Sequence, residues 1–275
     1  MSLPVVAALQ MVSGPEVAAN LAEADRLLAL AAAGGAQLAV LPENFAVFDS
    51  TRYRAVAATR PALLDWLAAA ARRHRLWLVA GTLPAATRPD GSPVPGGRVR
   101  SACHVLADDG RVVARYDKLH LFDVDVADGV GQYRESASFE PGETPVCVDT
   151  PVGRLGLSIC YDLRFPELYR TLAADGATLF AVPAAFTAVT GEAHWQVLLR
   201  ARAIENQCLV IGAGQGGAHG GSRHTHGHSQ IVDAWGTVLA LRAEAGPGVV
   251  LAPVDAPARA ALAARMPVQK HRRLR

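Results

Sequence analysis

Charged residues, aromatic residues and cysteines are all scarce in this sequence of 275 residues. Charged residues make up only 19% of the chain and the formal net charge is +2, so no strong field indicates a nucleic-acid partner. No run approaches the roughly twenty apolar residues of a membrane-spanning helix, and the first residues lack the basic region of a signal peptide. The sequence therefore predicts a soluble, cytoplasmic protein that binds neither nucleic acid nor membrane.

Disulfide bonds are not expected either. The four cysteines, Cys103, Cys147, Cys160 and Cys208, are widely spaced and form no CxxC motif. Hydrophobic residues make up 51% of the chain, which is enough for a large core that needs no covalent staples. A reducing compartment fits this pattern. We expect Cys103, Cys147 and Cys208 to be core thiols in β-strands.

Hydrophobic patterning predicts strands that alternate with helices in one α/β domain over residues 1–275. The expected strands cover residues 5–9, 37–42, 76–83, 100–106, 112–116, 146–150, 154–159, 179–182, 209–212, 228–233, 237–242 and 249–253. The expected helices cover residues 17–33, 61–73, 166–174, 194–206 and 257–266. Residues 84–98 and 119–141 are expected to be loops, and the length of the second is typical of a functional loop.

One cysteine follows a predicted strand directly. In GLSICYDLRFPEL, residues 156–168, a strand-like alternation ends at Cys160, and Pro166 with Glu167 favours a helix start. A side chain at a strand end can face a cleft, and the N–H groups of the turn remain free to bind an anion. Taken alone, Cys160 would more often be a buried core thiol. The rest of the sequence favours a nucleophile.

Two further polar side chains follow predicted strands, Glu43 in LPENF and Lys118 in YDKLHLFD. Each motif is weak by itself. Together with GLSICYDLRFPEL, and in this order, they resemble the three signatures of the nitrilase superfamily of carbon–nitrogen hydrolases. The resemblance covers nearly the whole chain. It implies a four-layer α-β-β-α sandwich and a catalytic set of Glu43, Lys118 and Cys160.

This set suits amide hydrolysis. A thiol attacks as thiolate and needs a base, and a carboxylate becomes basic enough when it is buried beside another acid. Glu43 would be the base, and Lys118 with the backbone N–H of Tyr161 would stabilise the oxyanion. By the resemblance a second glutamate precedes the cysteine. Glu135 in YRESASFEPG matches its position, and Glu140 is the competing candidate. No metal or cofactor is implied.

Several segments resemble the amidase branch that acts on deaminated glutathione and is related to the ω-amidases. These are CYDLRFPEL, PAAFTAVTGEAHWQVLLRARAIENQ, GHSQIVDAWG and PVQKHRR. The implied substrate is an α-keto acid with a terminal amide, hydrolysed through a thioester. Arg164 would bind the substrate carboxylate, or would instead pair with Glu167 or line a subunit contact. Phe186, Thr187 and Thr190 would shape the substrate wall or pack beneath their loop.

Other functions stay open on the sequence alone. An ω-amidase acting on α-ketoglutaramate, or an N-carbamoyl amino acid amidohydrolase, would share every catalytic residue and differ in the pocket. A catalytically silent binding module of the same fold is the non-enzyme alternative. The resemblance also implies a homodimer, with the basic tail at residues 266–275 near the subunit contact.

The histidines at positions 219, 224, 226 and 228 suggest a metal site at first sight. The glycines and Ser222 between them instead favour a flexible loop, and no carboxylate or thiol stands near them at a zinc-site spacing. His228 is expected to open a strand. The prediction is therefore that no metal binds here.

Overall fold

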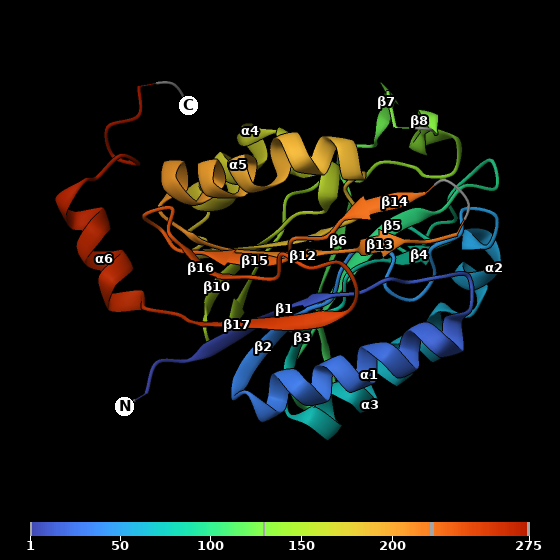
Figure 1. Ribbon diagram of the computed structural model, residues 1–275, viewed down its shortest axis with the longest axis horizontal. Helices are drawn as coiled ribbons and strands as arrows, with labels where there is room; N and C mark the ends of the chain where they lie inside the picture. Colours follow the sequence, from blue (N-terminus) through green and yellow to red (C-terminus); the bar gives the residue numbers. More distant parts are fainter. Residues whose placement is uncertain (1, 129, 221–222, 274–275) are drawn as a thin grey trace.

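Two β-sheets face each other at the centre of the molecule, and helices cover the outer face of each sheet (Figure 1). The computed structural model describes residues 2–128, 130–220 and 223–273. The helices in these ranges are α1 (Val17–Ala33), α2 (Tyr53–Ala58), α3 (Arg60–His74), α4 (Pro166–Ala174), α5 (Ala188–Asn206) and α6 (Ala256–Arg265). Helices α1 and α3 cover one sheet, and α4 and α5 cover the other. The four-layer α-β-β-α sandwich is therefore confirmed. Within the described ranges, no helix has the length and apolar character needed to cross a membrane.

The first sheet has the strand order β17-β1-β2-β3-β5-β4, and β6 pairs with β5. Its strands are β1 (Val5–Gln10), β2 (Ala36–Val40), β3 (Trp77–Val79), β4 (Leu83–Ala85), β5 (Arg100–Leu106), β6 (Val112–Asp117) and β17 (Gly248–Pro253). Strands β1, β2 and β3 run parallel. Their carboxyl ends therefore meet at one edge, where the chain continues toward Glu43.

The second sheet has the order β16-β15-β12-β11-β10-β9. Its strands are β9 (Cys147–Thr150), β10 (Gly153–Leu157), β11 (Leu179–Ala184), β12 (Leu209–Gly214), β15 (Gln230–Val232) and β16 (Val238–Leu241). Strands β10, β11 and β12 run parallel, so their carboxyl ends also share an edge. Two small hairpins complete the fold, β7 (Asp123–Val126) with β8 (Gly131–Arg134), and β13 (Gly216–Ala218) with β14 (His224–His226).

Alternate side chains of β1 pack into two different layers of the sandwich. Val6 and Ala8 belong to the same apolar cluster as Leu157 of the second sheet. Ala7 and Leu9 belong to the cluster that contains the buried face of α1. Both faces of the strand are buried, which is why β1 is a continuous apolar run in the sequence and shows no polar alternation.

Several expected elements have different bounds in the structure. The strand expected at 76–83 is divided, because the chain turns at Gly81 with φ of +50° between β3 and β4. A Cβ atom there would collide with the carbonyl oxygen of Pro42, so only glycine fits. The expected loop at 119–141 contains the β7–β8 hairpin and a 3₁₀ turn, Glu135–Ala137. The fifth helix begins at Ala188 and not near His194.

The three cysteines that were expected to be core thiols match this prediction only in part. Cys103 is buried in β5, as expected. Cys208 is also buried but lies just before β12, outside any strand. Cys147 opens β9 and is only half-buried, so its assignment to the core was wrong. An edge position explains this, because β9 is the last strand of its sheet.

Folding keeps His104 of β5 neutral, which predicts acid-sensitive stability. Its side chain is buried beside Arg60, and burial together with the charges of Arg115 and Arg60 lowers its pKa to about 3. An unfolded histidine binds a proton below its ordinary pKa of 6.5, whereas the folded one does so only near pH 3. The free energy of unfolding is therefore expected to fall as the pH decreases from 6.5 toward 3, by at most about 1.4 kcal/mol per pH unit from this group.

His104→Gln is expected to weaken this pH dependence, measured by urea unfolding at several pH values between 7.5 and 4. The exposed His271 provides the control, because His271→Gln should keep the wild-type slope. Equal slopes in wild type and His104→Gln would show that His104 does not contribute.

Candidate active site

Glu43 lies in the turn that follows β2, and the backbone of this turn is held on two sides. The side-chain amide of Gln215 donates to the carbonyl oxygen of Glu43 at 3.0 Å. The next residue, Asn44, has φ of +58° and donates its N–H to the Thr82 hydroxyl at 2.9 Å. Glu43 itself is buried. The turn that carries Glu43 is therefore fixed by Gln215, which directly follows β12 of the second sheet, and by Thr82, which directly precedes β4 of the first.

Lys118 is the first residue after β6, and its ammonium lies between two carboxylates. Nζ donates to Oε1 of Glu43 at 2.8 Å and to both carboxylate oxygens of Glu135 at 2.9 Å. Burial lowers the pKa of Lys118, but the negative charges of Glu135 and Glu43 outweigh burial and raise this pKa well above its usual range. The residue is therefore a permanent cation.

The structure brings Glu135, and not Glu140, to the lysine. The backbone N–H of Phe122 donates to Oε2 of Glu135 at 2.6 Å and fixes it beside Lys118. Burial raises the pKa of Glu135, an effect that Lys118 opposes and Glu43 reinforces.

Glu140 belongs to a separate ion cluster. Arg88 Nη2 and Arg100 Nε donate to its carboxylate at 2.7 and 2.8 Å. The hydrogen bond from Arg88, followed by that from Arg100, lowers the pKa of Glu140 to about 2. Glu140 is therefore a structural carboxylate, and its candidacy for the site was wrong.

Cys160 begins a 3₁₀ turn, Cys160–Arg164, shortly after β10, with φ of +48°. This left-handed conformation is strained for a residue with a Cβ atom and persists only where its surroundings enforce it. The buried carboxylate of Asp162 does so. It accepts hydrogen bonds from Ile159 N at 2.9 Å, from the Tyr116 hydroxyl at 2.6 Å, and from His120 N and Nδ1 at 3.0 and 2.7 Å.

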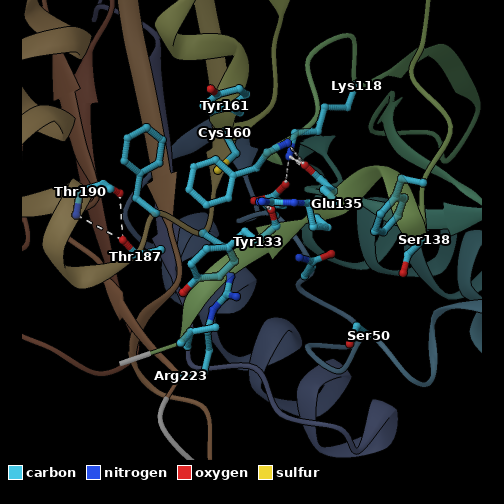
Figure 2. A pocket seen from close by; sticks show the side chains of 18 of the residues that line it. Ser50, Lys118, Tyr133, Glu135, Ser138, Cys160, Tyr161, Thr187, Thr190 and Arg223 are labelled. Carbon is cyan, nitrogen blue, oxygen red and sulfur yellow. Dashed lines mark hydrogen bonds and ion pairs between the residues drawn. The ribbon is translucent and has the colours of Figure 1, made fainter. Parts of the chain in front are cut away.

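The electrostatic surroundings keep the thiol of Cys160 protonated at rest. Burial raises its pKa well above the usual range, and the negative charge of Glu43 adds to this, whereas Lys118 acts in the opposite direction. In Figure 2 the thiol, the Lys118 ammonium and the Glu135 carboxylate are directed toward the same part of the pocket. A thiol in this state needs a base at the moment of attack.

All nine side chains predicted for the site line one cavity, with a volume of about 320 Å³. They come from both sheets and from the loops that follow them. They are Glu43, Lys118, Glu135, Cys160, Tyr161, Arg164, Phe186, Thr187 and Thr190.

Arg164 lies over the aromatic wall of this cavity. Its guanidinium carbon is 5.7 Å from the centre of the Tyr161 ring and 5.1 Å from that of Phe186. Nη1 lies 3.2 Å from Nδ1 of His194. Among the described residues no carboxylate pairs with Arg164, so the alternative of an ion pair with Glu167 is wrong within this chain.

Phe186 and Thr187, which follow β11, both line the cavity and support their own loop, the two roles that the sequence left open. Phe186 lines the cavity and also packs against Trp195, with ring centres 5.0 Å apart. Thr187 lines the cavity, and its hydroxyl caps α5 by accepting from the Thr190 N–H at 3.2 Å. This cap explains why α5 begins earlier than its apolar pattern indicates.

Sequence reasoning missed four residues of the site: Asp162, Gln215, Tyr133 and Arg223. Asp162 stands two residues after Cys160 in the motif CYDLRFPEL, so the sequence could have placed it near the thiol. Nothing in the sequence indicates that its carboxylate accepts from four donors. Gln215 and Arg223 are remote from every motif, and a single sequence carries no signal that would place them beside Glu43 or Tyr133.

The histidine segment is more ordered than the sequence prediction indicated. His224 and His226 lie in β14, and the rings of His226 and His228 stack with centres 4.0 Å apart, so the loop prediction was wrong. His228 precedes β15 and does not open it. His219 Nδ1 lies 2.7 Å from Ser13 O. Ser222 lies outside the described residues. Over those residues, no three His, Cys, Asp or Glu side chains are grouped to hold a metal ion.

Comparison with known proteins identifies the family. A sequence model of the family "Carbon-nitrogen hydrolase" matches residues 5–264. The chain belongs to this family. The deaminated glutathione amidase of Synechocystis is 45% identical over 272 residues, which cover 97% of each chain. The NitFhit protein of Caenorhabditis elegans superposes with a TM-score of 0.89 and 37% identity, over 99% of this chain and 66% of that longer protein.

A third relative bears on the thiol. An amidase from Nesterenkonia sp. AN1, with 29% identity and a TM-score of 0.80 over 98% of this chain and 96% of its own, was solved as a mutant with acrylamide added to its active-site cysteine. The chain described here, as a member of the carbon–nitrogen hydrolase family, is an amidase, an enzyme that cleaves the carbon–nitrogen bond of amides.

Proposed function

We propose that this amidase hydrolyses deaminated glutathione through a thioester formed on Cys160. The observation that carries the proposal is the buried ammonium of Lys118, held by Glu43 and Glu135 at the wall of the cavity that Cys160 enters. The substrate is taken from relatives with this name that are 42–45% identical to the chain. Both supports are independent, since one rests on geometry and the other on similarity.

In the first half of the reaction, Glu43 accepts the thiol proton as sulfur attacks the amide carbon of the substrate. The oxyanion that forms is stabilised by the Lys118 ammonium and the backbone N–H of Tyr161, neither of which needs to move. The carbon–nitrogen bond then breaks, Glu43 returns the proton to the departing amine, and a thioester remains on Cys160.

In the second half, Glu43 takes a proton from water, and the hydroxide attacks the thioester carbon. The carbon–sulfur bond breaks and the thiolate of Cys160 recovers its proton from Glu43. One water is consumed, and a carboxylic acid and an amine are released. Glu135 supports both halves as a positioning residue, because its two contacts with Lys118 keep the ammonium charged and in place.

The acyl half of the substrate bears the carboxylate of an α-keto acid, and Arg164 is its proposed partner. The guanidinium lies over the rings of Tyr161 and Phe186 and has no ion-pair partner among the described residues. Aromatic rings offer a guanidinium no acceptor oxygen, so its N–H groups stay available to a carboxylate apart from the contact of Nη1 with His194.

The substrate proposal is tested by comparing kcat/KM for deaminated glutathione, α-ketoglutaramate, an N-carbamoyl amino acid and a nitrile. Deaminated glutathione is expected to exceed each of the others by at least about tenfold, since it offers the most contacts in the transition state. A preference for α-ketoglutaramate would assign the chain to the ω-amidases and leave the proposed catalytic residues untouched. A preference for the nitrile would contradict the proposal that the substrate is deaminated glutathione.

A homodimer and a cytoplasmic location stay predictions. Within the tail expected at a subunit contact, Gln269 Nε2 donates to Glu205 O of the same chain at 3.2 Å. Residues 274 and 275 lie outside the described part of the chain.

A further inference from the structure

Two arginines besides Arg164 line the cavity, Arg134 and Arg223; Arg134 pairs with Asp125 at 3.0 Å, whereas Arg223 has no such partner among the described residues. The guanidinium carbon of Arg223 lies 4.9 Å from the centre of the Tyr133 ring and 5.2 Å from that of Phe48. An aromatic ring offers a guanidinium no acceptor oxygen, so these two contacts leave its N–H groups available to a ligand. Among the described residues, the guanidinium is therefore positioned by packing against these two rings.

The charge of Arg223 has no counterion among the described residues. No described carboxylate lies within ion-pair distance of its nitrogens, and its Nε is a buried donor without a hydrogen-bond partner. The carboxylate of Asp128 is electrostatically coupled to Arg223, but it accepts from the Tyr133 hydroxyl at 2.6 Å and from Val130 N at 3.1 Å. An unpaired guanidinium at a cavity wall is suited to an anionic ligand.

Arg223 also lies at the boundary between two hollows. The active-site cavity shares Arg223, Tyr53, Ser50 and Val130 with an adjoining hollow of about 380 Å³, whereas Arg164 lines only the active-site cavity. In the view of Figure 2, Tyr133 separates Arg223 from Cys160. The two arginines therefore occupy different ends of the space available to a substrate.

We propose that Arg223 binds a carboxylate on the amine half of the substrate, so that the enzyme selects amides with a carboxylate in each half. This inference rests on the proposed function. The acyl half stays attached to Cys160 as a thioester, so it belongs in the cavity that Cys160 and Arg164 line together. The amine half departs first, and the end that opens into the adjoining hollow at Arg223 gives it a way out. Deaminated glutathione has this form, with the keto-acid carboxylate in one half and the glycine carboxylate in the other.

The test compares deaminated glutathione with its glycinamide analogue, which lacks only the carboxylate of the amine half. In Arg223→Gln, the ratio of kcat/KM for the acid to that for the glycinamide is expected to fall about 10- to 100-fold, the loss typical of a charge-assisted contact. Arg164→Gln should lower both values together and leave the ratio near that of wild type. Arg272→Gln, which removes an exposed positive charge from the tail, is the control for net charge.

Arg223→Lys keeps the charge without the guanidinium fork, and its ratio should lie between those of wild type and Arg223→Gln. An unchanged ratio in Arg223→Gln, with wild type active on deaminated glutathione, would overturn the inference and leave the proposed function standing. A wild-type enzyme that cleaves neither compound would overturn the proposed function and the inference with it. General damage to folding lowers both values and therefore does not imitate the expected change in ratio.

Discussion

Replacing Cys160 with alanine is expected to lower kcat/KM for deaminated glutathione by at least about 10⁴-fold, because it removes the proposed nucleophile and with it the covalent route. No other thiol can substitute for it. Cys103 and Cys208 are buried elsewhere in the core, and Cys147 lies at the edge of the second sheet. The measurement is the release of cysteinylglycine, followed as a new primary amine.

Two further variants test whether a loss of activity is specific to the thiol of Cys160. Cys147→Ala removes a half-buried thiol away from the cavity and should retain wild-type turnover. Cys160→Ser should be nearly as inactive as Cys160→Ala, because a hydroxyl is far less acidic than a thiol in the same buried position. If Cys160→Ala kept more than about a tenth of wild-type activity, the thioester mechanism would be wrong.

Most of the site could be predicted because three motifs occur in the order expected for the family. Glu43, Lys118 and Cys160 each follow a strand, and strands that run parallel within a sheet place their carboxyl ends at a common edge. The motifs therefore gather once the two sheets face each other. A choice between Glu135 and Glu140 was beyond the sequence, because only tertiary packing brings Arg88 and Arg100 to the second of them.

The hydrogen bonds that position Glu43 and Cys160 were less predictable from the sequence. Gln215 contacts the backbone of Glu43 across 172 positions of sequence, and Asp162 accepts from Tyr116, 46 positions away. Neither contact follows from local pattern, because a single polar residue in a strand or turn has many possible partners. Local pattern did predict the bounds of helices 17–33 and 166–174, because their apolar faces lie within their own segments and Pro166 opens the second helix.

Local geometry also explains the elements that were predicted wrongly. The run 76–83 has strand-like composition throughout, yet the close approach of Pro42 to Gly81 forces a turn there. The hairpin of β7 and β8 has few buried side chains, so its sequence lacks the apolar alternation that indicates strands. Both departures lie near the site, since β3 leads past Glu43 and β8 leads into Glu135.

Replacing Lys118 with methionine is expected to reduce both activity and stability. The loss of Lys118 as the proposed oxyanion donor is expected to lower kcat by about 10²- to 10³-fold. The variant also leaves the carboxylates of Glu43 and Glu135 close together without their shared cation. Breaking a buried ion pair from one side costs about 3–5 kcal/mol of unfolding free energy. The measurements are kcat/KM and urea unfolding at neutral pH.

The double variant Lys118→Met/Glu135→Gln separates the two effects. Neutralising Glu135 removes the repulsion with Glu43, so the double variant should regain part of the lost stability, whereas activity should stay low because the oxyanion donor is still absent. Lys270→Met, which changes the only other lysine of the sequence, is the control and should match wild type in both measurements. If the double variant recovered activity together with stability, Lys118 would act through the fold alone, and the oxyanion would have to be stabilised by backbone N–H groups without it.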